Sequence, residues 1–239
     1  MKIIIINGSP RENGLTASIL HEIEKNLVKR NVDVAYYNLA DLSMAQCRGC
    51  CTCFTTGSCH IKDDAEKLSE IIADADGVVL GSPTYASNVS GYMKVLIDRG
   101  HFVIEQLLTG KKCITVTTGE NYGSRDASKV LERLVLYSGG SLVSKIVINA
   151  PFVRGGKVPM QDCEDSVQDF EDPVQPRLDY MCERAAGRLY DAVSSNKHYP
   201  LQILFHKLVF FFGIKPFVRR KGTEYAGVLR KWQDLGIDV

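Results

Sequence analysis

Five of the eight cysteines lie within thirteen residues, at Cys47, Cys50, Cys51, Cys53 and Cys59. Thiolates three residues apart in a compact loop can face a single metal centre. In a reducing compartment, such clustering is typical of metal binding or redox chemistry rather than of a disulfide framework. Four thiolates also satisfy structural zinc, although zinc sites more often use two Cys-x-x-Cys pairs set further apart. Free or disulfide-forming thiols are the remaining alternative.

A second chemical feature is the loop from Gly8 to Thr16, which follows a run of four isoleucines. Gly8 and Gly14 let the backbone turn tightly, Arg11 adds positive charge, and the helix that follows presents unpaired N–H groups. Hydroxyl or amide donors come from Ser9, Asn13, Thr16 and Ser18. The loop is neither a nucleotide-triphosphatase loop nor a dinucleotide fingerprint. It predicts a phosphate site, with an ordinary strand, turn and helix cap as the alternative.

Two later apolar stretches, 77–80 and 113–117, also end in polar loops. The first loop reads Gly81-Ser82-Pro83-Thr84-Tyr85-Ala86-Ser87-Asn88, and the second reads Thr118-Gly119-Glu120-Asn121-Tyr122-Gly123. Their hydroxyl, amide and aromatic groups are typical of ligand-binding loops.

The elements that must position these groups alternate along the chain. Strands are predicted at 3–6, 32–37, 77–80, 113–117 and 142–148, and helical apolar stripes recur at 19–27, 65–72, 93–97, 127–134 and 178–189. Strand–helix alternation indicates a doubly wound parallel sheet of the α/β class. Because parallel strands end at one edge, all three polar loops are expected there, and that edge is the predicted active site.

Composition narrows the function classes. The chain has 239 residues, 45% hydrophobic and 24% charged, with a formal net charge of +1. Such a small net charge does not create an overall electrostatic field that would attract nucleic acid or an anionic membrane. The amino-terminal apolar run is too short for a signal-peptide core, and no run approaches a spanning length, so a cytoplasmic protein is expected. The acidic stretch 151–176 predicts a loop or excursion.

The tail beyond residue 200 is dense in Leu and Phe and includes Phe210-Phe211-Phe212. Gly213 and Pro216 are predicted to interrupt it before the basic run Arg219-Arg220-Lys221. A subunit interface or a cover over the core is favoured, and an interfacial membrane helix is the alternative.

The three loops and the cysteines together resemble the flavodoxin-like NAD(P)H-dependent FMN reductases, and within them the iron-sulfur flavoproteins. The matching motifs are Gly-Ser-Pro-Arg-x-x-Gly-x-Thr from Gly8, Ser-Pro-x-Tyr from Ser82, and Thr-Gly at Thr118. The resemblance implies a five-stranded parallel sheet of order 2-1-3-4-5. It covers the chain to the last long helix, giving a flavodoxin-like FMN-binding domain at 1–198 and a helical extension at 199–239 as an expected interface.

The resemblance also implies site residues. The FMN phosphate would be contacted by Ser9, Arg11, Asn13, Thr16 and Ser18. One side of the isoalloxazine ring would be flanked by Pro83, Thr84, Tyr85, Ser87 and Asn88, and the other side by Thr118, Gly119 and Tyr122. A sheet of this order binds FMN where its first and third strands diverge, which agrees with the loop positions.

The family's cysteine pattern is Cys-x-x-Cys-x-x-Cys followed by a fourth Cys. The set Cys47, Cys50, Cys53 and Cys59 meets it and implies a 4Fe-4S cluster. This chain departs from the bacterial ferredoxin run in having five residues before the last Cys and His60 after it. Cys51 is a fifth thiol that offers an alternative register.

The function implied is an FMN-dependent oxidoreductase. Electrons would pass from NAD(P)H or a reduced carrier to a quinone, a nitroaromatic or an iron-sulfur centre, in a homodimer or homotetramer. No catalytic acid or base stands out, and His21, His101 and His206 are interpreted as surface or core residues. One alternative is a non-enzymatic FMN/iron-sulfur electron-transfer protein that works with a redox protein partner. Another is a flavodoxin-like regulatory module that binds a partner through the Phe-rich tail.

Overall fold

The computed structural model describes residues 1–150 and 174–237, so most of the predicted excursion at 151–176 lies outside the described residues. Its centre is a parallel sheet with strand order β2-β1-β3-β5-β6. The strands are β1 (Lys2–Asn7), β2 (Asp33–Asn38), β3 (Gly77–Tyr85), β5 (Lys112–Gly119) and β6 (Ser141–Asn149). This order confirms the predicted flavodoxin-like topology.

One difference lies at the end of β3. The sequence predicted that this strand stops at residue 80, whereas β3 continues to Tyr85 and pairs with the short antiparallel strand β4 (Asn88–Val89). Thr84 faces Val89 and Tyr85 faces Asn88 in this hairpin. The predicted second loop is therefore a strand end and a tight turn, because its backbone groups find partners within a few residues.

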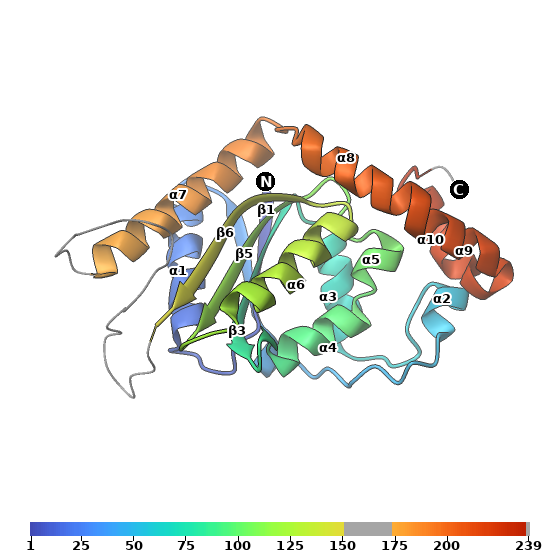
Figure 1. Ribbon diagram of the computed structural model, residues 1–239, viewed down its shortest axis with the longest axis horizontal. Coiled ribbons are helices and arrows are strands. Elements are labelled where there is room, and N and C mark those ends of the chain that lie inside the picture. The colour runs from blue at the N-terminus through green and yellow to red at the C-terminus, as the bar shows by residue number, and fades with distance from the viewer. Residues whose placement is uncertain (151–173, 238–239) are drawn as a thin grey trace.

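Helices cover both faces of the sheet (Figure 1). One face carries α1 (Leu15–Val28) and α7 (Val174–Ser194), and the other carries α3 (Asp64–Ala73), α4 (Gly91–Arg99), α5 (Phe102–Glu105) and α6 (Ser124–Tyr137). Ile3 and Ile5 belong to the core under the first pair, and Ile4 and Ile6 to the core under the second group. Burying each of these side chains stabilises the fold by about 2 kcal/mol. Burial on both faces explains why the first strand is apolar throughout.

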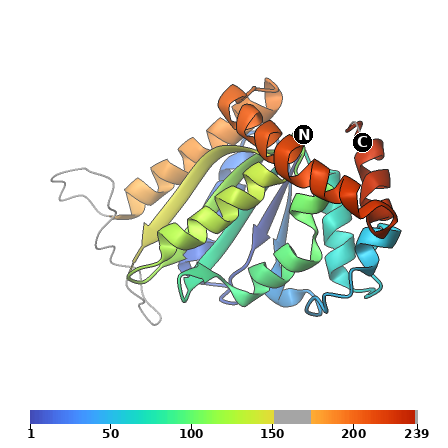
Figure 2. The ribbon, with the colours of Figure 1, turned by 45° about the vertical axis from the view of Figure 1, so that its right-hand side comes forward.

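The carboxyl-terminal extension is a long helical rod whose last helix turns back and packs against it (Figure 2). It comprises α8 (Pro200–Val209), the π-helical turn η2 (Phe210–Ile214), α9 (Lys215–Lys221), η3 (Gly222–Tyr225) and α10 (Ala226–Asp234). The predicted interruption at Gly213 and Pro216 is wrong, since the helix continues through both residues. In the π turn Lys215 N donates to Phe210 O, five residues back, and the helix continues past Pro216, which has no N–H to donate.

A third apolar cluster ties this extension to the domain. Phe210, Val218, Val228 and Trp232 are buried together, and Trp232 Nε1 donates to the carbonyl of Ile104 at 2.8 Å. The same cluster takes in Phe54 of the short helix α2 (Thr52–Thr56), next to the clustered cysteines. The extension therefore braces the cysteine-bearing segment as well as the domain. The boundary at 198/199 stays a prediction.

Candidate functional site

The first loop is fixed to its neighbour by short backbone contacts. Gly8 N donates to Gly81 O at 2.7 Å, and Ser90 Oγ donates to Gly8 O at 2.6 Å. A Cβ on Gly8 would lie 3.0 Å from both Gly81 O and Met93 Cβ. Only glycine lets the loops after β1 and β3 approach this closely.

Within the first loop, the polar groups hold a compact turn before α1. Ser9 N donates to Asn7 Oδ1 at 2.9 Å, and Arg11 N donates to Ser9 Oγ at 3.1 Å. Gly14 N then donates to Arg11 O at 3.2 Å. The N-cap residue of α1 is Gly14, which has no side chain to cap the helix, so the first-turn N–H groups of that helix are suited to bind an anion.

A hydroxyl pair joins the first and third loops. Thr16 Oγ1 and Thr118 Oγ1 lie 2.7 Å apart, and both residues are buried. Of the other predicted phosphate contacts, Ser9 is buried, whereas Arg11, Asn13 and Ser18 are exposed. Ser18 Oγ donates to Gly14 O at 3.1 Å. The predicted convergence of these loops is thus present in the fold.

The hairpin after β3 contains an unpaired buried hydroxyl. Thr84 Oγ1 has no hydrogen-bond partner among the described residues. Ala86 and Ser87 at the tip have φ of 50° and 59°, values that are costly for residues with a Cβ. Strain and unpaired polar atoms of this kind gather at ligand sites.

The third loop lies against this hairpin. Gly123 has φ of 85°, and a Cβ there would meet Ser87 Oγ at 2.7 Å and Ser87 Cα at 2.8 Å. The rings of Tyr85 and Tyr122 are 44% and 74% exposed at the rim. Exposed aromatic rings beside an uncapped helix fit a planar molecule that carries a phosphate, so the residues present fit FMN.

Sequence reasoning missed two supporting residues at this edge. Ser90 caps α4 through Met93 N at 3.1 Å while also holding Gly8 O. Ser124 Oγ donates to Asn149 Oδ1, joining the third loop to the end of β6. A serine immediately before a predicted helix was the available signal for Ser90; nothing local marked the contact between Ser124 and Asn149.

The cysteine loop, residues 43–63, has a different structure. Cys47 and Cys51 are exposed, and Cys50 Sγ lies 3.3 Å from His60 Nδ1. Cys53 is buried, and Cys59 is half-buried. No group of three or more Cys, His, Asp or Glu side chains in the described ranges is placed to hold a metal ion. The predicted ligand set is therefore not brought together in this conformation, and the residues as placed do not fit a cluster.

Local charges affect the thiol environment. Hydrogen bonds from the Thr52 side chain and backbone hold the pKa of Cys50 below its usual value. Burial alone would lower the pKa of His101, but hydrogen bonds with Cys53 and Glu105, and the charge of Glu105, raise it to about 10. Glu105 also pairs with Lys231 of α10. The interpretation of His101 as a structural residue agrees with these contacts.

An ion pair anchors both ends of the cysteine loop. Arg99 Nη1 and Nη2 each lie 2.8 Å from a carboxylate oxygen of Asp63, and Arg99 also donates to Ala45 O and Ile61 O at 2.6 and 3.2 Å. Asp63 also caps α3, because its Oδ1 accepts from Ala65 N at 3.1 Å. The Arg99 pairing was not predicted. The ion pair joins two segments that are 36 residues apart in the chain.

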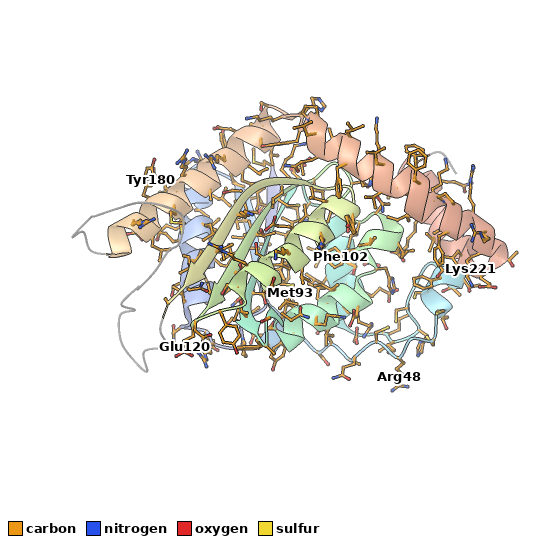
Figure 3. The ribbon with its side chains drawn as sticks, viewed as in Figure 1. Arg48, Met93, Phe102, Glu120, Tyr180 and Lys221 are labelled. Atoms are coloured by element: carbon orange, nitrogen blue, oxygen red, sulfur yellow. The ribbon has the colours of Figure 1, made fainter. Side chains whose placement is uncertain are left out.

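The cysteine loop and the three-loop edge lie apart within the chain. Figure 3 labels Arg48 on the cysteine loop and Glu120 on the third loop, toward opposite ends of the lower side of the molecule, with Met93 between them. Arg48 and Glu120 therefore lie well apart in the chain.

Comparisons with known proteins agree with this geometry. The family described as NADPH-dependent FMN reductase matches residues 1–153. A protein named iron-sulfur flavoprotein from Clostridioides difficile (strain 630) is 30% identical over 241 residues, covering 99% of this chain and 100% of that protein. Another of that name from Archaeoglobus fulgidus is 39% identical over 162 residues, covering 65% of this chain and 77% of that protein.

Solved structures support the same fold. A flavone reductase superposes with a TM-score of 0.58 at 16% identity, covering 83% of this chain and 65% of that chain. An archaeal flavodoxin gives a TM-score of 0.51 at 16% identity, covering 81% and 99%. At these identities the likeness shows the fold alone.

Fold and three-loop edge together define a flavodoxin-like α/β protein. The chain belongs to the NADPH-dependent FMN reductase family, and its full-length relatives include proteins named iron-sulfur flavoprotein. It is a flavin-dependent oxidoreductase that uses FMN. The resemblance inferred from the loop motifs and the cysteine spacing is confirmed.

Proposed function

We propose that this FMN-dependent oxidoreductase takes electrons from NAD(P)H and passes them to a small-molecule acceptor such as a quinone or a nitroaromatic. The observation that carries the proposal is the convergence of three loops at one sheet edge, where Thr16 and Thr118 touch at 2.7 Å. Bound FMN supplies hydride and single-electron chemistry. The residues of this chain bind it, orient it and leave one side open to solvent.

Each loop has a distinct binding role in this proposal. The uncapped α1 and the backbone of the first loop receive the phosphate, with Ser9, Arg11, Asn13, Thr16 and Ser18 around it. Thr84, whose Oγ1 is buried without a partner among the described residues, would flank the ring. Tyr85 and Tyr122 wall the ring, together with Pro83, Ser87, Asn88, Thr118 and Gly119.

Anaerobic turnover with NADH and NADPH tests the proposal. Protein loaded with FMN should oxidise at least one of them and reduce a quinone such as menadione. Bound FMN without oxidation of either nucleotide would leave a non-enzymatic electron carrier fed by a reduced protein. Failure to take up FMN at all would contradict both redox functions and leave the regulatory module.

We propose separately that Cys47, Cys50, Cys53 and Cys59 hold a 4Fe-4S cluster. Their spacing and the printed names of the relatives support it. The described conformation does not group these thiols, so they would have to move together to hold the cluster. Zinc is the competing occupant.

Iron, sulfide and zinc analysis of protein purified without oxygen tests this second proposal. Four irons and four sulfides per chain are expected for a cluster of this type. Cys53→Ser should abolish them, whereas Cys51→Ser, which removes the thiol outside the proposed set, should not. Zinc or no metal in the wild type would contradict the cluster. A homodimer or homotetramer and a cytoplasmic location stay predictions.

A further inference from the structure

An apolar stripe runs along the outer side of α8, η2 and α9. Its side chains recur at helical spacing, and Leu201 and Phe212 are each 81% exposed. The stripe comprises Leu201, Leu204, Leu208, Phe211, Phe212 and Phe217. Contiguous apolar surface on this scale marks an interaction site.

The inner side of the same rod is firmly attached to the domain. Gln202 accepts from Leu142 N at 2.7 Å and donates to Leu142 O at 2.9 Å. His206 Nε2 lies 2.6 Å from Gln106 Oε1, and Phe210 is buried against Trp232. These contacts hold the stripe facing outward.

The segment Pro200–Asp234 is the one helical stretch in the described parts of the chain whose length and composition would suffice to cross a membrane. The sequence predicted no run of that length, because it expected the helix to break at Gly213 and Pro216. If this segment crossed a bilayer, Phe210, Val218 and Trp232 would lose their buried contacts with the domain. The attached geometry instead leaves only the outer face for a surface to contact.

The charge on this segment is strongly one-sided. Residues 192–223 contain six Lys and Arg and no Asp or Glu, whereas the rest of the chain carries a net negative charge. Lys207 beside the stripe and Arg219, Arg220 and Lys221 at its end are exposed. Basic residues flanking exposed Leu and Phe are the pattern of a helix that lies in a membrane interface.

This charge pattern disfavours a second copy on the stripe. An antiparallel pair of these rods would place the basic end of one copy near Lys197 of the other. Glu224, the acidic side chain beside that basic end, already pairs with Lys221 of its own chain at 3.1 Å. An anionic bilayer offers both acyl chains for the stripe and negative headgroups for its flanks.

We propose that the α8–α9 face docks on an anionic lipid bilayer and holds the protein at the membrane surface. The apolar stripe enters the boundary between headgroups and acyl chains, and the flanking basic residues contact lipid phosphates. Lipid thereby occupies the surface that the sequence favoured as a subunit interface.

The docked orientation follows from the contacts of the rod. Gln202 bonds to Leu142 near the start of β6, and Lys112 Nζ, at the start of β5, lies 6.0 Å from the ring centroid of Tyr199. The predicted flavin loops follow the opposite ends of the same parallel strands. The flavin edge therefore faces water, and its substrates arrive from the aqueous side.

Vesicle flotation of the full FMN-loaded protein tests the proposal. It should float with vesicles of phosphatidylcholine and phosphatidylglycerol, remain unbound with phosphatidylcholine alone, and dissociate at high salt. Leu208→Gln with Phe212→Gln should weaken binding roughly hundredfold, because two large apolar side chains lose their burial. Lys207→Glu with Arg220→Glu should weaken it roughly thirtyfold or more.

Matched changes on another helix serve as controls. Val28→Gln and Lys29→Glu alter an exposed apolar and an exposed basic residue at the carboxyl end of α1, and should leave flotation unchanged. Circular dichroism checks that each variant is folded. FMN content and NAD(P)H oxidation should stay at wild-type levels in all of them, which separates this proposal from the redox function.

Two results would overturn the proposal. In the first, the wild-type protein does not bind anionic vesicles, and light scattering shows an oligomer that dissociates in the Leu208→Gln, Phe212→Gln variant. That result would assign the stripe to a second copy of the chain. The other is vesicle binding that survives both sets of α8–α9 changes.

Discussion

The flavin edge and the cysteine loop are held in place in different ways. At the flavin edge, three loops lie side by side because each follows the carboxyl end of a parallel strand. Hydrogen bonds between Gly8 N and Gly81 O and between the hydroxyls of Thr16 and Thr118 join them. The cysteine loop is secured at its ends by Arg99 and Asp63, while its thiols point to different surroundings. A site built from strand ends is assembled by the fold, whereas a site on an irregular segment needs its ligand to gather the donors.

The largest expected effect is on FMN affinity. Arg11→Ala combined with Thr16→Ala should weaken FMN binding about a thousandfold, because two hydrogen bonds to a charged phosphate are lost. Flavin fluorescence titration measures the dissociation constant, and circular dichroism should show an intact fold. Arg133→Ala, at an exposed position on α6, is the control and should bind FMN normally. Unchanged affinity in the double variant would put the phosphate elsewhere.

The next effect falls on the cysteine loop. Asp63→Asn leaves Arg99, whose side chain is 1% exposed, without its carboxylate and should lower the free energy of unfolding by about 3 kcal/mol. Although burial opposes it, pairing with Arg99 holds the pKa of Asp63 below its usual value. The greater stability of the wild type relative to Asp63→Asn is therefore present above about pH 4 and disappears as the pH falls further. Urea melts at pH 7 and pH 3 check this.

For this second change, Asp126→Asn is a matched control, since its carboxylate makes an exposed pair with Lys129. It should alter stability by less than about 0.5 kcal/mol. Equal losses of stability from the two substitutions would mean that the Arg99–Asp63 ion pair contributes no more than an ordinary surface ion pair. The FMN affinity of Asp63→Asn should remain normal, because the flavin edge is assembled separately.

A loss of stability at high pH is expected from His101 in the metal-free protein. Its pKa is raised to about 10 in the folded state, so its contribution is complete below the unfolded value near 6.5 and is lost as the pH rises toward 10. Glu105→Gln should flatten this part of the stability curve. Urea melts between pH 6 and pH 10 measure it, and an equally steep loss in Glu105→Gln would contradict the pairing.

The smallest expected effect tests loop contact at the flavin edge. Gly123→Ala forces a Cβ to within 2.7 Å of Ser87 Oγ at a φ of 85°, and should cost about 2 kcal/mol in stability and several-fold in FMN affinity. Gly110→Ala is the matched control, since its φ is 77° and a Cβ there meets nothing within 4 Å. Gly110→Ala should cost about 1 kcal/mol and leave FMN binding unchanged. Equal FMN affinities would show that this loop contact does not shape the site.

The same comparison explains what could be predicted from the sequence. Four consecutive isoleucines and strand–helix alternation sufficed for a doubly wound parallel sheet, because burial on both faces leaves a pattern that is local in the chain. The strand order came from the family resemblance. The common edge of the loops after β1, β3 and β5 followed from the parallel direction of the strands. Their convergence needed no side-chain detail.

The remaining features depend on partners far apart in sequence. Arg99 meets Asp63 and Lys231 meets Glu105 across 36 and 126 residues, and neither pairing has a periodic signature. Gly213 and Pro216 were interpreted as helix breakers because local propensity disfavours them. Packing of Phe210 and Val218 against Trp232 overrides that preference, and the π turn accommodates it.

Trp232, which seals the extension against Ile104, is the single tryptophan of the chain and is fully buried. Its emission therefore reports on one event, the seating of the carboxyl-terminal rod. Circular dichroism follows the helices of the whole molecule, so the two signals can separate release of the rod from unfolding of the sheet. The protein carries a built-in optical probe at the junction between its catalytic domain and its extension.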